Sequence, residues 1–291
     1  MQTMPDNFLT TYRKPLIKLI ESALEEDLGE GDHSGNACLT TAETRRAKLL
    51  VKEDCIIAGV AMAHLIFQHY DSNLKLTTHI SDGEEVTTGT VVFEVEGSSQ
   101  SLLATERLVL NCMQRMSGIA TLTRRLSAKI SHTQCRLLDT RKTTPNFRHA
   151  EKWAVRIGGG TNHRMGLYDE LMIKDNHIDY NGSMVDTLNK VRTYLDQKNK
   201  VLPVVVETRS LEELQTCLQF PWIHRVLLDN MNPNTLRQAL EINANQFPTE
   251  ASGNITEDTI VSIAETGVDY ISMGALTHSA QNIDLSLKAT H

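Results

Sequence analysis

The chain has 291 residues, of which 40 % are hydrophobic and 22 % charged; this composition is typical of globular proteins and excludes disordered and fibrous classes. Its 29 basic and 36 acidic residues leave a net charge of −7 with histidine neutral, which is unlike a general nucleic-acid binder, so no nucleic-acid partner is expected. The longest mostly apolar run, 55–67, is shorter than the roughly 18 residues of a membrane span, so no membrane partner is expected.

The N-terminal residues and the cysteines indicate the cellular compartment. Asp6, Arg13 and Lys14 interrupt any apolar run of the kind found in a signal peptide. The five cysteines are odd in number, widely spaced and contain no Cys-x-x-Cys pair, a pattern that predicts neither a disulfide scaffold nor a zinc site. We therefore expect a soluble, cytoplasmic protein.

The first part of the chain combines a helix with a small sheet. Apolar residues recur at helical spacing over 14–28, and Gly29 follows as a stop signal. From Arg46 to Gly97 the pattern changes to short β-rich runs separated by glycine turns. A small sheet domain is therefore predicted, and residues 101–130 then predict one or two helices, with a break near Ser117 and Gly118.

The rest of the chain alternates strands with helices. Strands are predicted over 135–140, 170–174, 203–207, 225–229, a weak segment before Ser252, and 269–274. Helices are predicted between them, over 211–218, 235–242 and 256–266. This alternation predicts a mostly parallel sheet. Because the segment is much shorter than the ~250 residues of eight strand–helix units, we expect a short barrel of six or seven strands.

Polar and glycine residues follow these strands at their carboxyl ends. They are Arg141, Lys174, Glu207, Asp229, Ser252 and Gly274. In α/β barrels the chemistry lies at this end, because the loops after the strands converge there. The sequence thus predicts a site at the carboxyl edge of the sheet.

A basic stretch within an acidic chain indicates an anionic ligand. Residues 136–174 hold eight basic and four acidic residues, and the cations near strand ends are Arg141, Lys142, His163, Arg164 and Lys174. Guanidinium groups suit planar carboxylates and phosphates. A solvated basic face is the plainer alternative, but these cations adjoin predicted strand ends rather than helical surfaces.

Two acids and two glycine-containing loops complete the predicted site. Glu207 and Asp229 are hard oxygen ligands of the kind that Mg²⁺ prefers, although they could instead neutralise Lys174 or bind a ribose hydroxyl. The loops 250–256 and 272–278 each place glycine at a strand end before a helix, where backbone N–H groups bind phosphate. The triple glycine 158–160 fits neither a dinucleotide nor a P-loop motif and is interpreted as a flexible turn.

An ordered set of motifs resembles one enzyme family. The motifs are EEDLGEGD (25–32), DTRKT (139–143), GGGTNHRMGL (158–167), KDNH (174–177), LLDN (227–230), EASGNIT (250–256) and GVDYISMGALTH (267–278). Together they resemble quinolinate phosphoribosyltransferase, over nearly the whole chain. The resemblance implies an N-terminal α/β sandwich, here 1–117, followed by an incomplete seven-stranded α/β barrel, here 118–275, with the tail 276–291 packing back on the first domain.

The resemblance also implies a reaction and an assembly. Quinolinate and phosphoribosyl diphosphate would give nicotinate mononucleotide, diphosphate and CO₂, with Mg²⁺, in the synthesis of NAD. Members form homodimers whose active sites are shared between subunits, and assembly of dimers into a hexamer is left open.

Matching motif positions imply a role for each candidate residue. Arg107 would reach the partner subunit's site, while Arg141, His163, Arg164 and Lys174 would hold the quinolinate carboxylates, with Lys142 near the diphosphate. Glu207 and Asp229 would meet Mg²⁺ and the ribose hydroxyls, and catalysis would rest on these two acids with Lys142 and Lys174. The 5′-phosphate would lie against Ser252, Gly253, Asn254 and Gly274. Thr140, Met273 and Ala275 complete the expected substrate-binding set.

Three departures and two alternatives accompany this interpretation. Val205 stands where members often have an outer glutamate, Asn146 replaces a common glycine and Met231 replaces a common phenylalanine. Of the three departures, Asn146 is the one expected to affect the conformation of its loop. A nicotinate phosphoribosyltransferase, which releases no CO₂, is the alternative enzyme. A non-catalytic phosphate-binding barrel, or a relative associated with molybdenum transport, is the alternative of another class, disfavoured because every expected cation is present.

Overall fold

The structure is a computed structural model that describes residues 7–40 and 43–290. It has two compact units. The first unit contains the described residues up to Arg124, with 143–159 and the segment from Ala275 onward; the second contains 125–142 and 160–274. The expected boundary between 117 and 118 remains a prediction, and the compact units divide the chain slightly later, within a helix.

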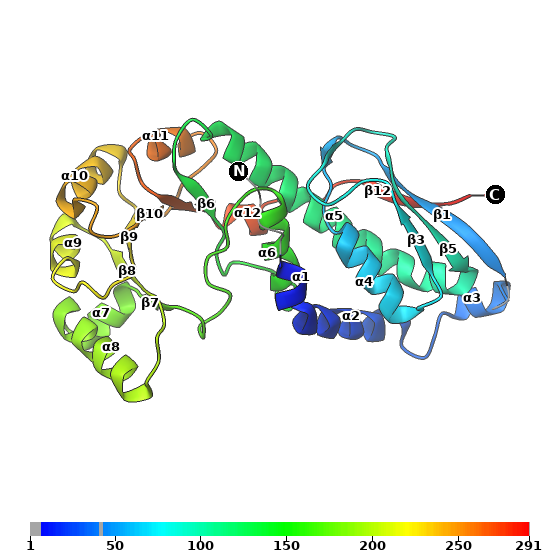
Figure 1. Cartoon of the computed structure of the whole chain (residues 1–291), viewed down its shortest axis with the longest axis horizontal. Helices are drawn as coiled ribbons and strands as arrows, with labels where there is room; N and C mark the ends of the chain where they lie inside the picture. Colours follow the sequence, from blue (N-terminus) through cyan, green and yellow to red (C-terminus); the bar gives the residue numbers. More distant parts are fainter. Residues whose placement is uncertain (1–6, 41–42, 291) are drawn as a thin grey trace. The chain divides into compact units, whose positions relative to one another are not determined.

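A four-stranded antiparallel sheet forms the centre of the first unit, in the order β12-β1-β5-β3. Its strands are β1 (Thr44–Val51), β3 (Lys75–Thr78), β5 (Val91–Ser98) and β12 (Leu285–Thr290). Ala47, Leu49 and Val51 are buried at alternate positions of β1, as in a sheet with one covered face. Figure 1 shows β12, near the C-terminus, beside β1. The tail of the chain thus supplies an edge strand of this sheet.

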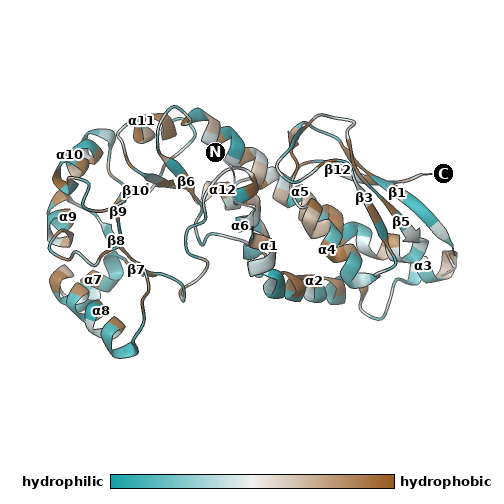
Figure 2. Ribbon diagram, in the orientation of Figure 1, coloured by the Kyte–Doolittle hydropathy of each residue, from teal (hydrophilic) through white to brown (hydrophobic). Residues whose placement is uncertain are grey.

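Seven helices and one short antiparallel strand pair complete the described part of the first unit. The helices are α1 (Phe8–Thr11), α2 (Arg13–Leu28), α3 (His33–Cys38), α4 (Val60–Tyr70), α5 (Ser99–Lys129), α6 (Arg148–Ile157) and α12 (Ala275–His278). The pair is β2 (Cys55–Ile56) with β4 (Glu85–Val86). Helix α2 confirms the helix predicted over 14–28, and Gly29, whose φ is 49°, caps its C-terminal end. Figure 2 shows α4 mostly hydrophobic, in keeping with its six buried residues.

The predicted break near Ser117 and Gly118 is wrong, because α5 continues unbroken from Ser99 to Lys129. Gly118 is present for packing: a Cβ at this position would overlap the carbonyl oxygen of Gln281. Ser117 is likewise used in packing, since its hydroxyl donates to the carbonyl of Ala58 and accepts from the Ala58 N–H. Two residues that resemble a helix stop therefore mark a close approach of the chain to the helix.

The second unit contains a six-stranded sheet in the order β6-β11-β10-β9-β8-β7, with every neighbouring pair parallel. Its strands are β6 (Arg136–Leu138), β7 (Leu171–Ile173), β8 (Val204–Thr208), β9 (Arg225–Asp229), β10 (Thr249–Ser252) and β11 (Tyr270–Ser272). All six predicted strands are confirmed. A seventh position is marked only by an isolated parallel bridge between Thr161 and Leu138, because the chain beyond Thr161 turns to the side chain of Asp139 instead of continuing the ladder.

Helices connect the strands of the second unit (Figure 1). They are α7 (Asp175–Asn181), α8 (Met184–Lys198), α9 (Leu211–Cys217), α10 (Pro233–Asn243) and α11 (Ile260–Ala264). Helices α9 and α10 confirm the predictions over 211–218 and 235–242. Helix α11 begins four residues later than predicted, because the residues from Thr256 form a turn in which the Thr256 N–H donates to the Thr259 hydroxyl. The strand cores are apolar: Val204, Val205 and Val206 are at most 1 % exposed.

Candidate active site

The predicted polar residues do lie at the carboxyl ends of the parallel strands. Lys174 directly follows β7, Glu207 is the penultimate residue of β8 and Asp229 ends β9. The next strand, β10, ends at Ser252, which pairs in register with Asp229. Thr140 and Arg141 follow β6, and Met273 and Gly274 follow β11. One edge of one sheet therefore carries the ends that the sequence singled out.

Lys174 and Glu207 form an ion pair at this edge. Lys174 Nζ lies 3.4 Å from Glu207 Oε2, with the lysine side chain 47 % exposed and the glutamate 10 %. Burial raises the pKa of Glu207 above its ordinary value; Lys174 opposes this rise and Asp229 adds to it. The two carboxylates are thus close enough to influence each other, and a cation between them would relieve both burial and repulsion.

His177 helps to fix the start of α7. The Lys174 N–H donates to His177 Nδ1 at 2.9 Å, which closes the first turn of the helix. Because this backbone contact holds the residue that pairs with Glu207, the histidine acts on Lys174 through the main chain.

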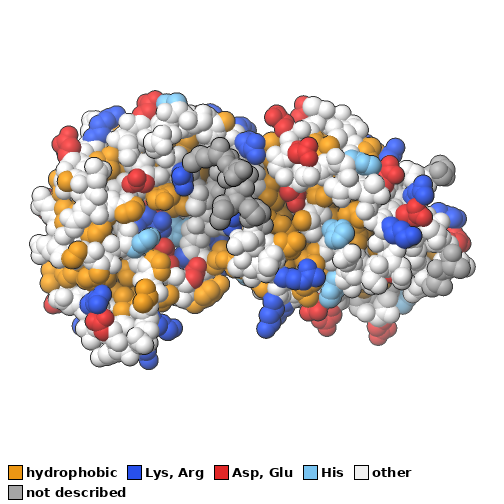
Figure 3. Space-filling model, viewed as in Figure 1, with side chains coloured by type: hydrophobic (Ala, Val, Ile, Leu, Met, Phe, Trp, Pro, Cys, Tyr) orange, Lys and Arg blue, Asp and Glu red, His pale blue; other side chains and the backbone are white. Residues whose placement is uncertain are grey.

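Arg164 is half-buried, and its Nη1 donates to the carbonyl oxygen of Glu170 at 3.2 Å. Burial lowers the pKa of Arg164, and the charge of Arg141 lowers it further, while Glu170 and Asp169 oppose the change. Two like charges that influence each other indicate a place suited to an anion. Figure 3 shows Lys, Arg and His side chains among hydrophobic ones on the face of this unit where β7, β8 and β9 lie.

Asp139 holds the segment that carries His163 and Arg164. Its carboxylate is fully buried, and it accepts from the His163 N–H at 2.8 Å and from Asn162 Nδ2 at 2.6 Å. The triple glycine before this segment does form a turn, in which Gly159 has a φ of 96°; its flexibility stays a prediction. A Cβ on Gly158 would crowd the carbonyl oxygen of Ala120 on α5. Glycine is needed there for close packing.

His163 points into a buried charged cluster. Its Nδ1 lies 3.3 Å from Glu170 Oε1 and its Nε2 lies 3.4 Å from Glu250 Oε2. Arg225 Nε lies 2.9 Å from the same Glu250 oxygen, and Arg225 Nη2 lies 3.4 Å from Glu170 Oε2. His163 is only 7 % exposed. The predicted ligand residue is thus oriented by two acids that the sequence analysis did not select.

Strand periodicity is the signal that could have found part of this cluster. Glu250 lies two residues before Ser252 in β10, so the two side chains share a face of the sheet. Arg225 lies four residues before Asp229 in β9 and shares a face with it in the same way. No comparable signal marks Glu170, which precedes β7.

The predicted phosphate loop after β10 is held by Asn230. Gly253 has a φ of 92°, and a Cβ there would overlap the Asn230 side chain. Asn254, with a φ of 51°, donates from Nδ2 to Asn230 Oδ1 at 2.9 Å. Asn230 itself follows Asp229 and donates to its Oδ2 at 2.6 Å. The loop is therefore tied to the acid at the end of the neighbouring strand.

The loop at Asn146 has the conformation that a glycine would allow. Asn146 has a φ of 63°, in the left-handed region that asparagine tolerates better than most residues. Replacement of the common glycine by asparagine is therefore compatible with this turn.

Arg107 and the expected metal ligands, Glu207 and Asp229, lie in different units of the chain. Arg107 is exposed on α5 in the first unit. Within residues 7–40 and 43–290, no group of three or more His, Cys, Asp or Glu side chains forms a candidate metal centre. Glu207 and Asp229 fit Mg²⁺ only if water and substrate oxygens supply its other ligands, which is the coordination that Mg²⁺ commonly adopts.

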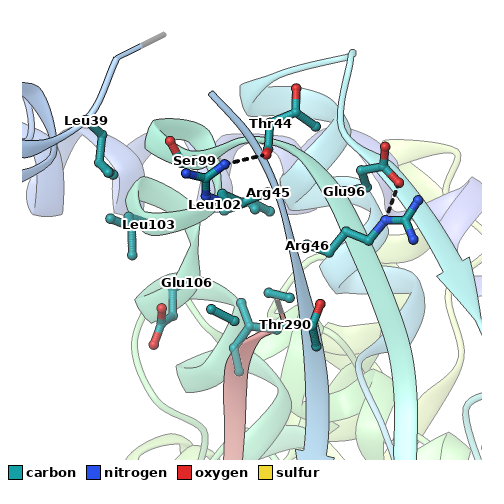
Figure 4. Close-up of a pocket in the computed structure, with 13 residues that line it drawn as sticks. Leu39, Thr44, Arg45, Arg46, Glu96, Ser99, Leu102, Leu103, Glu106 and Thr290 are labelled. Atoms are coloured by element: carbon teal, nitrogen blue, oxygen red, sulfur yellow. Dashed lines mark hydrogen bonds and ion pairs between the residues drawn. The ribbon is translucent and has the colours of Figure 1, made fainter. Parts of the chain in front are cut away.

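A cavity of about 800 Å³ lies in the first unit, between β1, β12 and α5 (Figure 4). Arg46 and Glu96 form an ion pair of 2.7 Å at its wall, and Leu102 and Leu103 supply apolar surface. Its lining contains none of the predicted site residues. No helix in the described part of the chain is both long and apolar enough to cross a membrane.

The fold and the site define an α/β protein with a partial barrel, whose cations and paired acids are arranged for an anionic substrate. Comparison with known proteins gives the particular family. Residues 32–117 match the N-terminal domain of quinolinate phosphoribosyl transferase, and residues 119–288 match its C-terminal domain. The chain belongs to the quinolinate phosphoribosyltransferase family.

Individual relatives are similar over most of the chain. Quinolinate phosphoribosyltransferase 1 (decarboxylating) of Nicotiana glauca is 45 % identical, covering 93 % of this chain and 81 % of its own. The probable nicotinate-nucleotide pyrophosphorylase (carboxylating) of Bacillus subtilis is 38 % identical over 94 % and 93 %. The crystal structure of NadC from Streptococcus pyogenes is 35 % identical, with a TM-score of 0.89 and 99 % of each chain covered.

Proposed function

We propose that this protein transfers phosphoribose from phosphoribosyl diphosphate to quinolinate and removes one carboxylate as CO₂, giving nicotinate mononucleotide and diphosphate for NAD synthesis. The observation that carries the proposal is the pairing of Lys174 with Glu207 at one sheet edge of a family member, where Arg141 also follows a strand end. Cations there suit a dicarboxylate, and acids there suit a ribose and a metal ion.

The proposed binding roles divide the substrates between these groups. Arg141, Arg164 and Lys174 hold the two carboxylates of quinolinate. His163 supports Arg164, since its Nδ1 accepts the Arg164 N–H at 2.7 Å while Glu170 and Glu250 hold its ring. Lys142 neutralises the diphosphate. The loop of Ser252, Gly253 and Asn254, with Gly274 after β11, holds the 5′-phosphate through backbone N–H groups.

The proposed reaction needs no general base from the protein for the attack on ribose C1. The pyridine nitrogen of quinolinate attacks ribose C1 with its own lone pair as the bond to diphosphate breaks. The alkylated ring is cationic, so it stabilises the electron pair that stays at C2 when the C2–carboxylate bond breaks and CO₂ departs. A proton that comes from solvent then bonds to C2 and completes nicotinate mononucleotide. The chain's residues orient the two substrates and exclude water, and Lys142 stabilises the negative charge that develops on the leaving group.

Glu207 and Asp229 are the residues that would hold Mg²⁺. Their mutual repulsion and the burial of Glu207 make a cation favourable at this position. When bound, Mg²⁺ would supply charge stabilisation for the leaving diphosphate. The two acids would also bond the ribose hydroxyls and so orient C1.

The oligomeric state and the cellular compartment are also part of the proposal. Arg107 is exposed on a helix of the first unit, to which Ala275 also belongs, whereas the candidates from Thr140 to Gly274 lie in the second. We propose a homodimer in which Arg107 enters the partner's site, and a cytoplasmic location.

The test measures both products. Purified protein is incubated with quinolinate labelled at the 2-carboxylate, phosphoribosyl diphosphate and Mg²⁺, and CO₂ and nicotinate mononucleotide are quantified. Equal yields that depend on Mg²⁺ are expected. Nicotinate, which lacks the 2-carboxylate, should react at least ~10-fold less efficiently in kcat/KM, because it loses at least one charge-assisted hydrogen bond to the cations that would hold that carboxylate.

Other outcomes would refute the proposal. Mononucleotide formed from nicotinate without CO₂ release would indicate the non-decarboxylating enzyme. Quinolinate binding in calorimetry without any turnover would indicate a binding protein.

A further inference from the structure

An ion pair outside the proposed substrate-binding set joins two helices of the first unit. Arg115 Nε, in the middle of α5, lies 2.9 Å from Glu151 Oε1 on α6. The Glu151 side chain is fully buried, and that of Arg115 is 20 % exposed. A carboxylate removed from water persists only where cations and hydrogen-bond donors satisfy it. Its donors therefore show what the pair holds in place.

Glu151 holds the loop that follows β6. The Thr144 N–H donates to Glu151 Oε2 at 2.9 Å, and the Thr144 hydroxyl donates to Oε1 at 3.0 Å. Arg148 Nε donates to the neighbouring Thr143 hydroxyl at 2.9 Å. Thr144 comes two residues after Lys142, so the carboxylate anchors the loop that carries this lysine.

Arg115 holds the segment that follows β11. Its Nη1 donates to the carbonyl oxygen of Ala280 at 2.7 Å, and its Nη2 donates to that of Thr277. Both carbonyls lie at or just beyond the end of α12, where backbone oxygens lack partners within the helix. Helix α12 begins at Ala275, directly after Gly274. The same guanidinium thus anchors the chain that leaves the predicted phosphate loop.

We propose that Arg115 and Glu151 are positioning residues for phosphoribosyl diphosphate, an inference that rests on the proposed function. One ion pair anchors the segment of Lys142, which meets the diphosphate, and the segment of Gly274 and Ala275, which meets the 5′-phosphate. These groups bind opposite ends of one substrate. Because reacting groups must be placed to within a fraction of an ångström, loss of the shared anchor weakens the binding of that substrate first.

The side chains are matched to this task and supply informative variants. Arginine offers a rigid planar fork, whereas lysine has one flexible point charge and cannot reach three acceptors on two segments. Glu151→Gln keeps the shape of the side chain but turns an amide N–H₂ toward a donor. Both variants should loosen the two segments without opening a cavity.

The experiment measures KM for each substrate and kcat for full-length Glu151→Gln and Arg115→Lys. KM for phosphoribosyl diphosphate should rise about tenfold. KM for quinolinate should change less than about threefold, since only Arg141 among its proposed ligands lies on an anchored segment. Glu265→Gln, which breaks the exposed pair with His132, is the matched control and should leave both KM values unchanged.

Three kinetic outcomes would overturn the proposal: unchanged KM values, equal increases for both substrates, or a loss of kcat alone. A pair with only a structural role would lower the melting temperature and leave the ratio of the two KM values as in the wild type. If Glu151→Gln and Arg115→Lys do not fold, Thr144→Ala tests the proposal through the same ratio of the two KM values. Thr144 is exposed, so its replacement leaves the core intact.

Amide hydrogen exchange separates this inference from the proposed function. The Thr144 N–H should exchange faster in Glu151→Gln than in the wild type, whatever reaction the protein catalyses. If the Thr144 N–H exchanges faster but the protein shows no transferase activity, the anchoring role of Glu151 is supported and the proposed function is refuted. If the exchange rate is unchanged and the protein is active, only the anchoring role of Glu151 is refuted.

Discussion

At the scale of single residues, the charged cluster beneath the site departs most from ordinary expectation. Glu250 is fully buried on β10, beside His163 and Arg225. Burial alone would raise the pKa of Glu250, but His163 and Arg225 outweigh it, and the pKa lies below its ordinary value. The folded chain therefore favours the charged carboxylate.

This depressed pKa predicts a pH-dependent contribution to stability. The contribution is present above the ordinary glutamate pKa of about 4.3 and is lost as the pH falls through the lower folded value. Glu250→Gln should therefore reduce the free energy of unfolding at pH 7 by about 3 kcal/mol, because Arg225 and His163 lose their shared partner. Urea denaturation at a series of pH values should show this difference shrinking below about pH 4.

The exposed pair of Glu265 and His132 supplies the comparison. Glu265→Gln should change the free energy of unfolding by less than about 1 kcal/mol. A Glu250→Gln difference that stays constant with pH would show that the loss comes from packing and not from the carboxylate charge.

At the scale of elements, α5 is organised around close approaches at glycine. Gly118 of this helix meets the carbonyl oxygen of Gln281, and Gly158, after α6, meets that of Ala120 on α5. In a helix interior glycine normally costs about 1 kcal/mol relative to alanine. Its presence at 118 means that packing outweighs helix propensity there.

Gly118→Ala should therefore destabilise the protein in spite of its better helix propensity. We expect the free energy of unfolding to fall by about 2 kcal/mol, since the added methyl group must displace backbone. Asn111→Ala, at an exposed position of the same helix, should instead raise it by a few tenths, up to about 0.5 kcal/mol. Thermal and urea unfolding of the two variants decide the point, and a Gly118→Ala protein as stable as the wild type would refute it.

At the scale of the whole molecule, the position of Arg107 bears on assembly. Arg107 is exposed on α5, and its proposed role requires a second copy of the chain. If sites are shared, a chain lacking Arg107 and a chain lacking Lys142 each lack a different part of the same site. A mixed dimer would then contain one intact site and one site without either residue.

Mixing Arg107→Ala chains with Lys142→Ala chains should therefore restore activity. Random exchange makes half of the dimers mixed, and one of their two sites is complete, so about one quarter of wild-type activity is expected. Each variant alone, taken through the same exchange procedure, is the control. Absence of recovery after demonstrated subunit exchange would contradict a shared site.

Several features could be predicted from the sequence because their causes are local. Val204–Val206 is a short apolar run ended by Glu207, and such a run predicts a buried strand with a polar carboxyl end wherever it lies. The same reasoning located Lys174, Asp229 and Ser252 at strand ends. The order of strands and helices was predicted for the same reason.

The sequence by itself thus determined the order of the elements, the strand ends that carry the site and, through its motifs, the family. Only the tertiary structure decided that α5 runs unbroken past Gly118, that His163 is held by Glu170 and Glu250, and that Arg115 and Glu151 anchor two distant segments. The physical reason is one of range. Periodicity and turn chemistry act between near neighbours in the chain, whereas Arg115 and Thr277, or His163 and Glu250, meet only when packing has brought their elements together.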